Sequence, residues 1–397
     1  MLVYLADESM IAAANCCKWK RSLLKMTSQE IVSSSQNEYP QVTLNAASAA
    51  GENTLVPGSD PQALTDNIAF LRVFAAISVF AVHMYCAAGQ PQNLWGSIAA
   101  YGAQGQIFFY ILSGLLVMDS YARSKSSKQY CIRRIARIAP LYYSWLIVIL
   151  GCVALGWLDF GAARGAFDIP RALLMLGSLM PPTTSYAWNS MAGLGIVANF
   201  VVFYALVPII SKYIKNVTSA FFLVWGMILM ALLTPSIATL LYSGICGQND
   251  LTGFIGLTFC SNAYFIAFGV LIYYGVKTNK KQLFAYLLLF YAATNYFSFL
   301  KPFECGAIFA LFAAIIICFP LKLGWIGKVF QKLSPYTFTF FIVHMTCWPV
   351  MVYLHDQYHW KIHVAILIIA SSVMVSFFVY HLIERPARAW ILKKFQA

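Results

Sequence analysis

The sequence predicts an all-α protein, a polytopic transmembrane helical bundle of about ten spans with eleven as the alternative. Of its 397 residues, 60% are apolar and only 10% are charged, whereas soluble domains carry about 25% charged residues. The mean hydropathy is +0.69. Several apolar stretches approach the roughly 20 residues that cross a bilayer, and without water each must be helical to satisfy its own backbone. The alternating pattern of a transmembrane barrel is absent.

Uncharged stretches define the expected spans. They are residues 68–87, 104–122, 138–158, 191–210, 218–240, 252–275, 282–299, 304–320, 336–354 and 362–383. A further apolar piece at 169–182 is too short to cross comfortably, so we expect it to be re-entrant or interfacial. If it does cross, it is the eleventh span.

The positions of the basic residues explain the net charge of +13. When the N-terminus is placed in the cytoplasm, 22 of the 27 lysines and arginines fall in cytoplasmic connectors and 4 in outer connectors. The remaining one, Arg72, lies within the first helix. Positive charge gathers on the cytoplasmic loops of membrane proteins. We therefore predict that both termini are cytoplasmic and that the basic residues contact membrane lipids, with no nucleic acid as partner.

The chain divides into one membrane domain and two tails. Residues 1–66 are rich in Ser, Ala, Asn and Gln, which predicts a disordered cytoplasmic tail. Asp7 and Glu8 interrupt the short apolar start, so no secretory signal peptide is expected. Residues 67–390 form the predicted transmembrane domain, and residues 391–397 form a short cytoplasmic tail.

Two ionisable side chains lie within the first predicted helix. Arg72 and His83 are about three turns and about 16 Å apart along the axis, so both project from one face. An ionisable residue in hydrocarbon is costly and marks a functional candidate. The structural alternative is that Arg72 extends to the interface and His83 bonds a neighbouring helix. Their shared face favours a functional role.

The connector after the second helix concentrates positive charge without any acid. At its end stand Arg133, Arg134 and Arg137, of which the first and last share a helical face. A guanidinium fork matches phosphate oxygens, so these arginines can clamp an anion. The alternative is that they orient the chain and contact anionic lipid.

Three further residues are candidates for a supporting role. His344 lies midway along its span, and Glu384 and Arg385 stand at the cytoplasmic edge before Pro386. We expect Glu384 to pair with a nearby arginine, which is a structural role.

No metal site is predicted. His355, His359 and His363 are spaced by four residues near the last outer loop, but only Asp356 accompanies them as a potential further ligand. The ten cysteines show neither metal-ligand nor disulfide spacing.

Four motifs occur in a recognisable order. The first is the pair Arg72 and His83, and the second is IFFYILSGLLV, which includes Ser113 and looks like Phe-Phe-x-x-Ser-Gly. The third, RRIARIAP, is similar to Arg-Arg-x-x-Arg-Ile-x-Pro, and the last comprises SPYTFTFFIVH and the closing ERP. In this order, over about residues 66–390, the sequence resembles acyltransferase family 3, membrane proteins that O-acylate extracytoplasmic carbohydrates.

The resemblance implies an O-acyltransferase that moves an acyl group, expected to be acetyl, from cytoplasmic acyl-CoA to a hydroxyl of an extracytoplasmic or lipid-linked glycan. It also implies a multi-pass protein of the bacterial inner membrane, with acetyl-CoA as a substrate and no tightly bound cofactor. The residues expected to bind the donor are Arg133, Arg134, Arg137 and Ser113.

One stretch departs from the family pattern. A Glu usually stands a few residues before the Phe-Tyr of a middle helix, but the segment ANFVV before Phe203 and Tyr204 contains no acid. The Trp-Ser-Leu that tends to precede that Glu is also not recognisable. The resemblance therefore supplies no acidic group here for acceptor recognition or acid/base support.

The residues allow one mechanism with two routes. A donor held from the cytoplasm presents its thioester near His83, in the outer half of the first helix, while a glycan enters from outside. His83 takes the proton of a sugar hydroxyl as general base, and Arg72 holds the donor or stabilises charge at the thioester carbonyl. In the second route His83 itself attacks and forms an acyl-imidazole.

The main alternative function is a transporter or flippase of a lipid-linked saccharide without acyl-transfer chemistry. A transporter of the inverted-repeat type should show related halves and paired Gly/Pro-broken helices, and no such symmetry is recognisable in the sequence. A membrane glycosyltransferase would require acidic residues in outer loops, which are few here. Acetyl transfer from acetyl-CoA by the purified protein separates these classes.

The charge distribution predicts which loops lie on each side of the membrane. Reporter fusions after Gln90 and Asp356 should read as outside, because these connectors are poor in basic residues. Fusions after Lys128 and Lys394 should read as inside. A cytoplasmic signal from the fusion at Gln90 would invert the whole topology.

Overall fold

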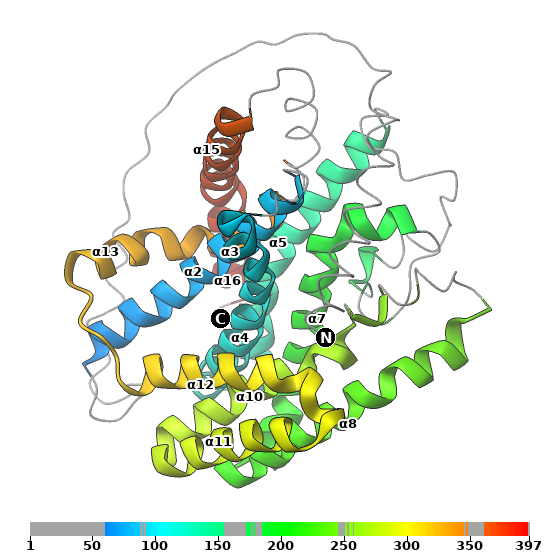
Figure 1. Ribbon diagram of the computed structural model, residues 1–397. Helices are drawn as coiled ribbons and strands as arrows, with labels where there is room; N and C mark the ends of the chain where they lie inside the picture. The colour runs from blue at the N-terminus through cyan, green and yellow to red at the C-terminus, as the bar shows by residue number, and fades with distance from the viewer. Residues whose placement is uncertain are drawn as a thin grey trace.

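The computed structural model describes residues 60–87, 90, 93–154, 172–175, 177, 179, 185–244, 251, 254–256, 258–344, 347 and 361–395. Every regular element within these ranges is helical (Figure 1), as the sequence predicts. Residues 1–59 of the predicted disordered tail, His355 and His359 lie outside the described residues, as does most of the apolar piece at 169–182. Residues 61–66, which the sequence predicts to be part of the tail, belong to the first helix instead.

The helices have the following bounds. They are α2 (Pro61–Ala87), α3 (Leu94–Ala100), α4 (Gly105–Ala122), α5 (Ser127–Ala154), α7 (Ser185–Tyr213), α8 (Val217–Tyr242), α10 (Phe259–Thr278), α11 (Lys280–Tyr296), α12 (Glu304–Cys318), α13 (Gly324–Leu333), α15 (Lys361–Val379) and α16 (Arg385–Lys394). Short turns are η1 (Tyr101–Gln104), η2 (Ser298–Phe303), η3 (Ser334–Tyr336) and η4 (Tyr380–Glu384), and residues 337–344 are also helical.

Six stretches of the described residues are helical, long and apolar enough to cross a membrane. They are Pro61–Cys86, Gly96–Ala122, Ile196–Tyr213, Val217–Tyr242, Phe254–Thr278 and Ser298–Cys318. Each coincides with one of the spans that the sequence predicts. Many large apolar side chains on them are exposed, for example Phe222, Leu229 and Leu240 on α8, as expected of a surface in contact with lipid.

The other four predicted spans are not among these six stretches. The span 138–158 lies within α5 as far as Ala154, the span 282–299 corresponds to α11 of 17 residues, and the span 336–354 is described as a helix only at 337–344. The span 362–383 corresponds to α15 and η4. The total of about ten spans and the cytoplasmic position of both termini therefore stay predictions.

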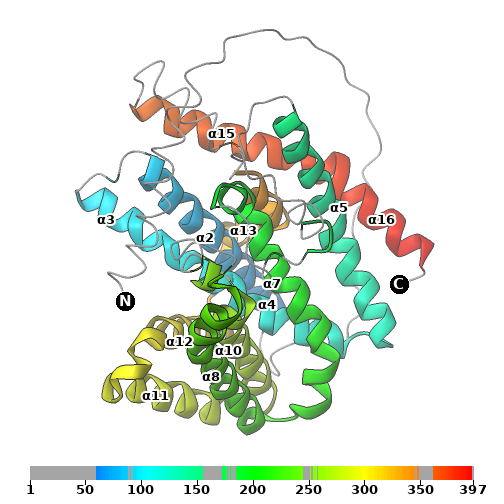
Figure 2. The same cartoon turned by 90° about the vertical axis from the view of Figure 1, so that its right-hand side faces the viewer.

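The helices form two groups on either side of a central layer. In both views α8, α10, α11 and α12 lie together at one end of the molecule, and α15 with α16 lies across the other end (Figures 1 and 2). Helices α2, α4 and α7 lie between them. In the span that contains α10, 76% of the hydrophobic stretch is buried, whereas in the α8 span only 33% is buried. Helix α10 is therefore central and α8 peripheral.

Glycines bring α4 against its two main neighbours. A Cβ on Gly114 would collide with the carbonyl of Ile266 in α10, and a Cβ on Gly269 would collide with the carbonyl of Ile111 in α4. Small residues that allow backbones to approach are the usual means of packing helices in a membrane. The glycine of the Ser-Gly motif therefore sets the α4–α10 crossing, and Gly102 in η1 approaches the α2 backbone in the same way.

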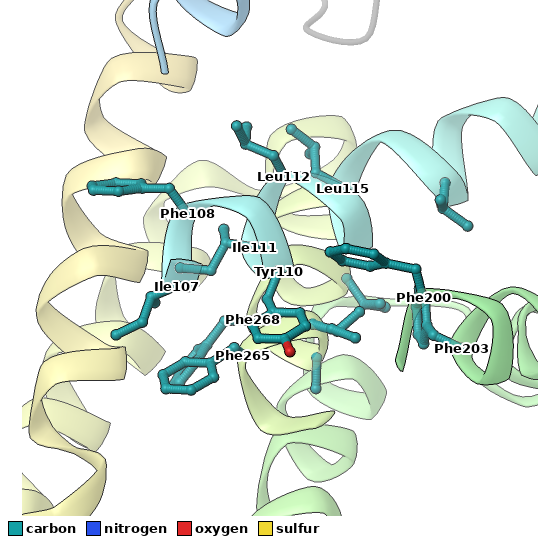
Figure 3. Packing of buried hydrophobic residues seen from close by; sticks show 14 of the residues in the cluster. Ile107, Phe108, Tyr110, Ile111, Leu112, Leu115, Phe200, Phe203, Phe265 and Phe268 are labelled. Atoms are coloured by element: carbon teal, nitrogen blue, oxygen red, sulfur yellow. The ribbon is translucent and has the colours of Figure 1, made fainter. Parts of the chain in front are cut away.

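Aromatic side chains fill the space around this crossing. Figure 3 shows Tyr110 of α4 between Phe200 of α7 and Phe265 of α10. The ring centroids of Tyr110 lie 5.3 Å from Phe200 and 6.1 Å from Phe265. The Tyr110 hydroxyl also accepts a hydrogen bond of 2.8 Å from Asn199 Nδ2. Asn199, within the stretch that lacks the family's acid, thus ties α7 to α4.

Polar side chains fix the beginning of α2. The Asp60 carboxylate accepts the backbone N–H of Gln62 at 2.9 Å and so caps the helix before Pro61. Asn67 Nδ2 donates to the Leu321 carbonyl at 2.7 Å. The Asp66 carboxylate accepts a hydrogen bond from Gln331 of α13. These contacts hold the predicted cytoplasmic end of α2 against α13 and the turn that precedes α13.

Candidate active site

Helix α2 lies beside the segment 334–344, and the two run in the same direction. Arg72 Nη1 donates to Ser334 Oγ at 3.5 Å near one end. Eleven residues further along α2, the His83 ring centroid lies 5.2 Å from that of His344. Because Arg72 precedes His83 and Ser334 precedes His344, the order of the contacts makes the two segments parallel. The two candidates of the first helix therefore each meet a polar residue of the same partner segment.

Aromatic rings enclose the histidine end of this contact. The Phe80 ring of α2 packs on Phe340 at 5.4 Å and against the edge of His344 at 6.0 Å. The Phe340 ring stacks on His344 at 5.6 Å with an interplanar angle of 14°. His344 is 1% exposed, whereas His83 is half-buried. The pair therefore offers one accessible imidazole backed by an enclosed one.

One hydrogen bond defines the tautomer of His344. Its Nδ1 lies 2.9 Å from the backbone carbonyl of Phe340. A carbonyl oxygen can only accept, so Nδ1 carries the hydrogen and the neutral ring keeps a lone pair on Nε2. Among the described residues this buried Nε2 has no hydrogen-bond partner.

A cavity of about 460 Å³ lies at the arginine end of the contact. It lies at the predicted cytoplasmic end of α2 and is bounded by α2, α4, α5, α13, η3, η4 and α16. Its lining residues are Thr65, Ile68, Ala69, Arg72, Leu116, Arg137, Gln331, Ser334, Pro335, Tyr380, Glu384 and Arg388. Three guanidinium groups and one carboxylate leave the cavity with positive charge, which suits an anionic ligand.

The arginines of the cavity repel one another. Arg137 and Arg134 both act on Arg72 as like charges, and Arg137 acts in the same way on Arg388. An isolated cluster of this kind is unfavourable in a partly desolvated site, and a bound anion relieves the repulsion. Glu384 compensates only part of the charge.

Proline accounts for the placement of Glu384. Pro386 has no N–H, and a proline ring in a regular α-helix clashes with the carbonyl four residues earlier. The turn before Pro386 is the wider π-helical turn η4, and the Arg385 N–H donates to the Tyr380 carbonyl at its end. Glu384 in this turn is 3% exposed, and burial raises the pKa of its carboxyl group. Single π-helical turns are frequent at functional sites.

Glu384 and its neighbours tie the last helix to the segment that carries His344. Thr339 Oγ1 donates to Glu384 Oε2 at 2.6 Å, and the Tyr336 hydroxyl lies 3.0 Å from His381 Nε2. Thr339 is five residues before His344. This contact is compatible with the structural role expected for Glu384. The side chain that donates to Glu384 in it is a threonine, whereas the sequence predicts an arginine.

The three predicted donor arginines occupy different surroundings. Arg137 lines the cavity. Arg134 lies over the rings of Tyr130 and Tyr204, at 5.6 Å and 5.2 Å from their centroids, and donates to the Leu116 carbonyl at 3.4 Å. Arg133 is half-buried and does not line the cavity. The structure thus brings together Arg72, Arg137 and Glu384 and leaves Arg133 outside the cavity.

Two other predicted residues also lie outside the lining. Ser113 is half-buried and stands three residues before the lining residue Leu116, so it shares that face of α4 one turn further along the helix. Arg385 is exposed. His363 lies in α15, but its side chain is outside the described part of the structure. Among the side chains that are described, no group of three potential metal ligands is found.

Sequence reasoning missed five polar lining residues. They are Thr65, Gln331, Ser334, Tyr380 and Arg388. Arg388 follows Glu384 by four residues, a spacing that places both on one helical face and that was a usable signal. Thr65 precedes Arg72 by seven residues, which places both on one face of α2. Gln331, Ser334 and Tyr380 carry no signal of their own, because only the tertiary packing of α13, η3 and η4 brings them to the cavity.

Known proteins match parts of this chain. The family described as an acyltransferase domain matches residues 66–381. Nodulation protein 10 of Rhizobium leguminosarum bv. viciae is 34% identical over 98 residues, which are 24% of this chain and 27% of that protein. The O-acetyl transferase of Shigella phage Sf6 is 32% identical over 102 residues, 25% of this chain and 30% of that protein.

The chain therefore spans less than a third of the length of these curated relatives in either alignment. No solved structure matches it. The family match, by contrast, extends from Asp66 in α2 to His381 in η4, and with this match the chain belongs to the acyltransferase 3 family of membrane acyltransferases.

Proposed function

We propose that this membrane O-acyltransferase moves an acetyl group from cytoplasmic acetyl-CoA to a hydroxyl of an extracytoplasmic or lipid-linked glycan. The observation that carries the proposal is the shared face of α2, with the basic cavity at Arg72 and the histidine pair at His83 about three turns away. An anionic donor and an imidazole base are the two groups that acyl transfer from a CoA thioester requires.

The cavity supports the donor half of the proposal. Coenzyme A carries phosphates, and arginine forks bind phosphate oxygens in a bidentate manner. Arg72 and Arg137 reach the cavity from α2 and α5, and Arg388 stands exposed at its edge. With the phosphates bound there, the flexible pantetheine arm would extend along α2 toward His83. This placement favours donor binding over carbonyl stabilisation as the role of Arg72.

The histidine pair supports the transfer half. The acceptor hydroxyl oxygen attacks the thioester carbonyl, the C–S bond breaks and CoA leaves as a thiolate, while His83 takes the hydroxyl proton as general base. Direct attack by His83 would instead give an acyl-imidazole that the sugar hydroxyl then opens. The half-buried position of His83 beside the enclosed His344 suits either route.

The same geometry and one relative support the proposed side of acceptor entry and the proposed acyl group. The histidine pair lies in the predicted outer half of α2, so an acceptor enters from the outer side of a bacterial inner membrane. The phage relative is named an O-acetyl transferase, which supports acetyl as the transferred group. A transporter or flippase shares the spans and the charged cavity, but gives no role to a histidine pair packed at the far end of the same helical face.

The cavity predicts different effects for two neighbouring arginines. Arg137→Ala should weaken acetyl-CoA binding about tenfold or more, because it removes a charged, forked phosphate contact. Arg137→Lys should restore only part of the affinity, since a point charge cannot reproduce the fork. Arg133→Ala is the matched control on the same helix, outside the cavity, and should bind nearly as the wild type. Calorimetric titration of the purified variants with acetyl-CoA measures the difference.

Equal losses in the Arg133 and Arg137 variants would contradict a specific phosphate site at the cavity. Loss of protein from the membrane in both variants, with normal affinity of the remainder, would assign these arginines to membrane insertion.

His83→Gln tests the base. Glutamine keeps much of the size and hydrogen bonding of histidine but cannot take a proton, so transfer should fall by about 10²–10⁴-fold while donor binding survives. His381→Gln is the matched control, because that histidine bonds Tyr336 outside the histidine pair, and it should retain transfer. The assay follows [¹⁴C]acetyl from acetyl-CoA into the glycans of host membranes.

Near-normal transfer by His83→Gln would remove His83 from the mechanism. Absence of transfer by the wild type, with intact uptake or export of a saccharide, would favour the transporter class.

A further inference from the structure

His344 has one nitrogen with a partner and one without. Its Nδ1 is committed to the Phe340 carbonyl, and its buried Nε2 has a lone pair without a donor among the described residues. A buried acceptor that lacks a donor is unfavourable, and a catalytic role is one explanation for such an atom in a native structure. The titratable ring of His83 lies beside it, with centroids 5.2 Å apart.

We propose that His344 is the positioning residue of His83. Its Nε2 accepts a ring N–H of His83, and so orients His83 and stabilises the imidazolium that forms when His83 takes the acceptor proton. This inference rests on the proposed function, in which His83 is the general base. It assigns to a neutral imidazole the role that a carboxylate has in many catalytic triads.

The geometry allows this contact without movement of the backbone. The ring centroids lie 5.2 Å apart and the rings are tilted by 46°, a separation that a rotation of the His83 side chain alone can close to a hydrogen bond with His344 Nε2. Catalytic hydrogen bonds are commonly long in ligand-free structures and tighten when substrate binds. His344 itself is held by the Nδ1 hydrogen bond and by the Phe340 ring stacked on it, so its lone pair has a fixed direction.

The proton balance of the transfer step supports a neutral partner. His83 gains the hydroxyl proton at one ring nitrogen, and its other ring nitrogen then carries a hydrogen that must be bonded in a low-dielectric site. His344 Nε2 provides the acceptor for that hydrogen, and no proton moves to His344. The ANFVV stretch before Phe203 supplies no acid for the same purpose, and its Asn199 bonds Tyr110.

Two substitutions of His344 distinguish a positioning role from a packing role. The amide of Asn lies near the place of Nδ1, so His344→Asn keeps the bond to the Phe340 carbonyl but removes the acceptor at Nε2. The amide oxygen of Gln reaches the place of Nε2, so His344→Gln keeps an acceptor there. Positioning predicts that His344→Asn lowers the rate of acetyl transfer more than about tenfold, and that His344→Gln is clearly the more active of the two.

The measurement is the kcat and KM for [¹⁴C]acetyl-CoA, with host membranes as the source of acceptor, normalised to monodisperse purified protein. We expect kcat to fall and the KM for acetyl-CoA to stay within about threefold, since the arginine cavity is about three turns away. The reverse order of activity, with Asn above Gln, would overturn the proposal because the Nδ1 bond would then be the important one.

A double-mutant cycle tests whether His344 acts through His83. In a His83→Gln background, His344→Asn should cost no further activity, because there is no imidazolium left to stabilise. Additive losses would contradict the coupling. Normal kcat in both His344 variants would also contradict it, and would leave His83 as an unassisted base.

A measurement on the unaltered protein covers the case in which the His344 variants do not fold. In ¹⁵N-histidine-labelled protein, nuclear magnetic resonance should show a neutral histidine with its hydrogen on Nδ1 and a bare Nε2. If every neutral histidine carries its hydrogen on Nε2 instead, the proposal is overturned. Lack of acetyl transfer by the wild type would refute the proposed function separately, whatever tautomer is found.

Discussion

The parallel contact between α2 and the segment 334–344 is the constraint on which the site depends. It joins a polar pair at each end, Arg72 with Ser334 and His83 with His344. Polar groups in a hydrocarbon setting are costly without partners, so a slip of one helix along the other would separate both pairs together. The same contact therefore fixes the helix register, closes one wall of the cavity and brings the two imidazoles side by side.

The cytoplasmic end of that contact is shaped by the closing Glu-Arg-Pro motif. Pro386 follows the π-helical turn η4, which buries Glu384 where Thr339 donates to it. Thr339 and His344 belong to one helical segment, so the carboxylate that lowers the positive charge of the cavity also anchors the segment that carries the second histidine. In the proposed mechanism, a donor in the cavity therefore contacts the same framework that positions His83.

Much of this site could be predicted from the sequence, because hydrocarbon leaves few polar residues to choose from. The shared face of Arg72 and His83 follows from helix geometry alone, and the six described spans follow from apolar length. That Arg137 lines the cavity and Arg133 does not depends on how α5 packs against its neighbours, and the spacing of residues in the sequence does not specify this packing. Ser334 and Gln331 reach the cavity only through tertiary contacts. The tautomer of His344 depends on a backbone carbonyl one turn away and needs coordinates.

The central claim is that one face of α2 connects a phosphate-binding cavity to the histidine pair. The most direct test is a structure of the protein with a non-hydrolysable acetyl-CoA thioether. The account predicts phosphate density between Arg72 and Arg137 and the sulfur of the analogue within contact distance of the His83 ring. Phosphates bound elsewhere, or a sulfur directed away from His83 while the phosphates occupy the cavity, would contradict it.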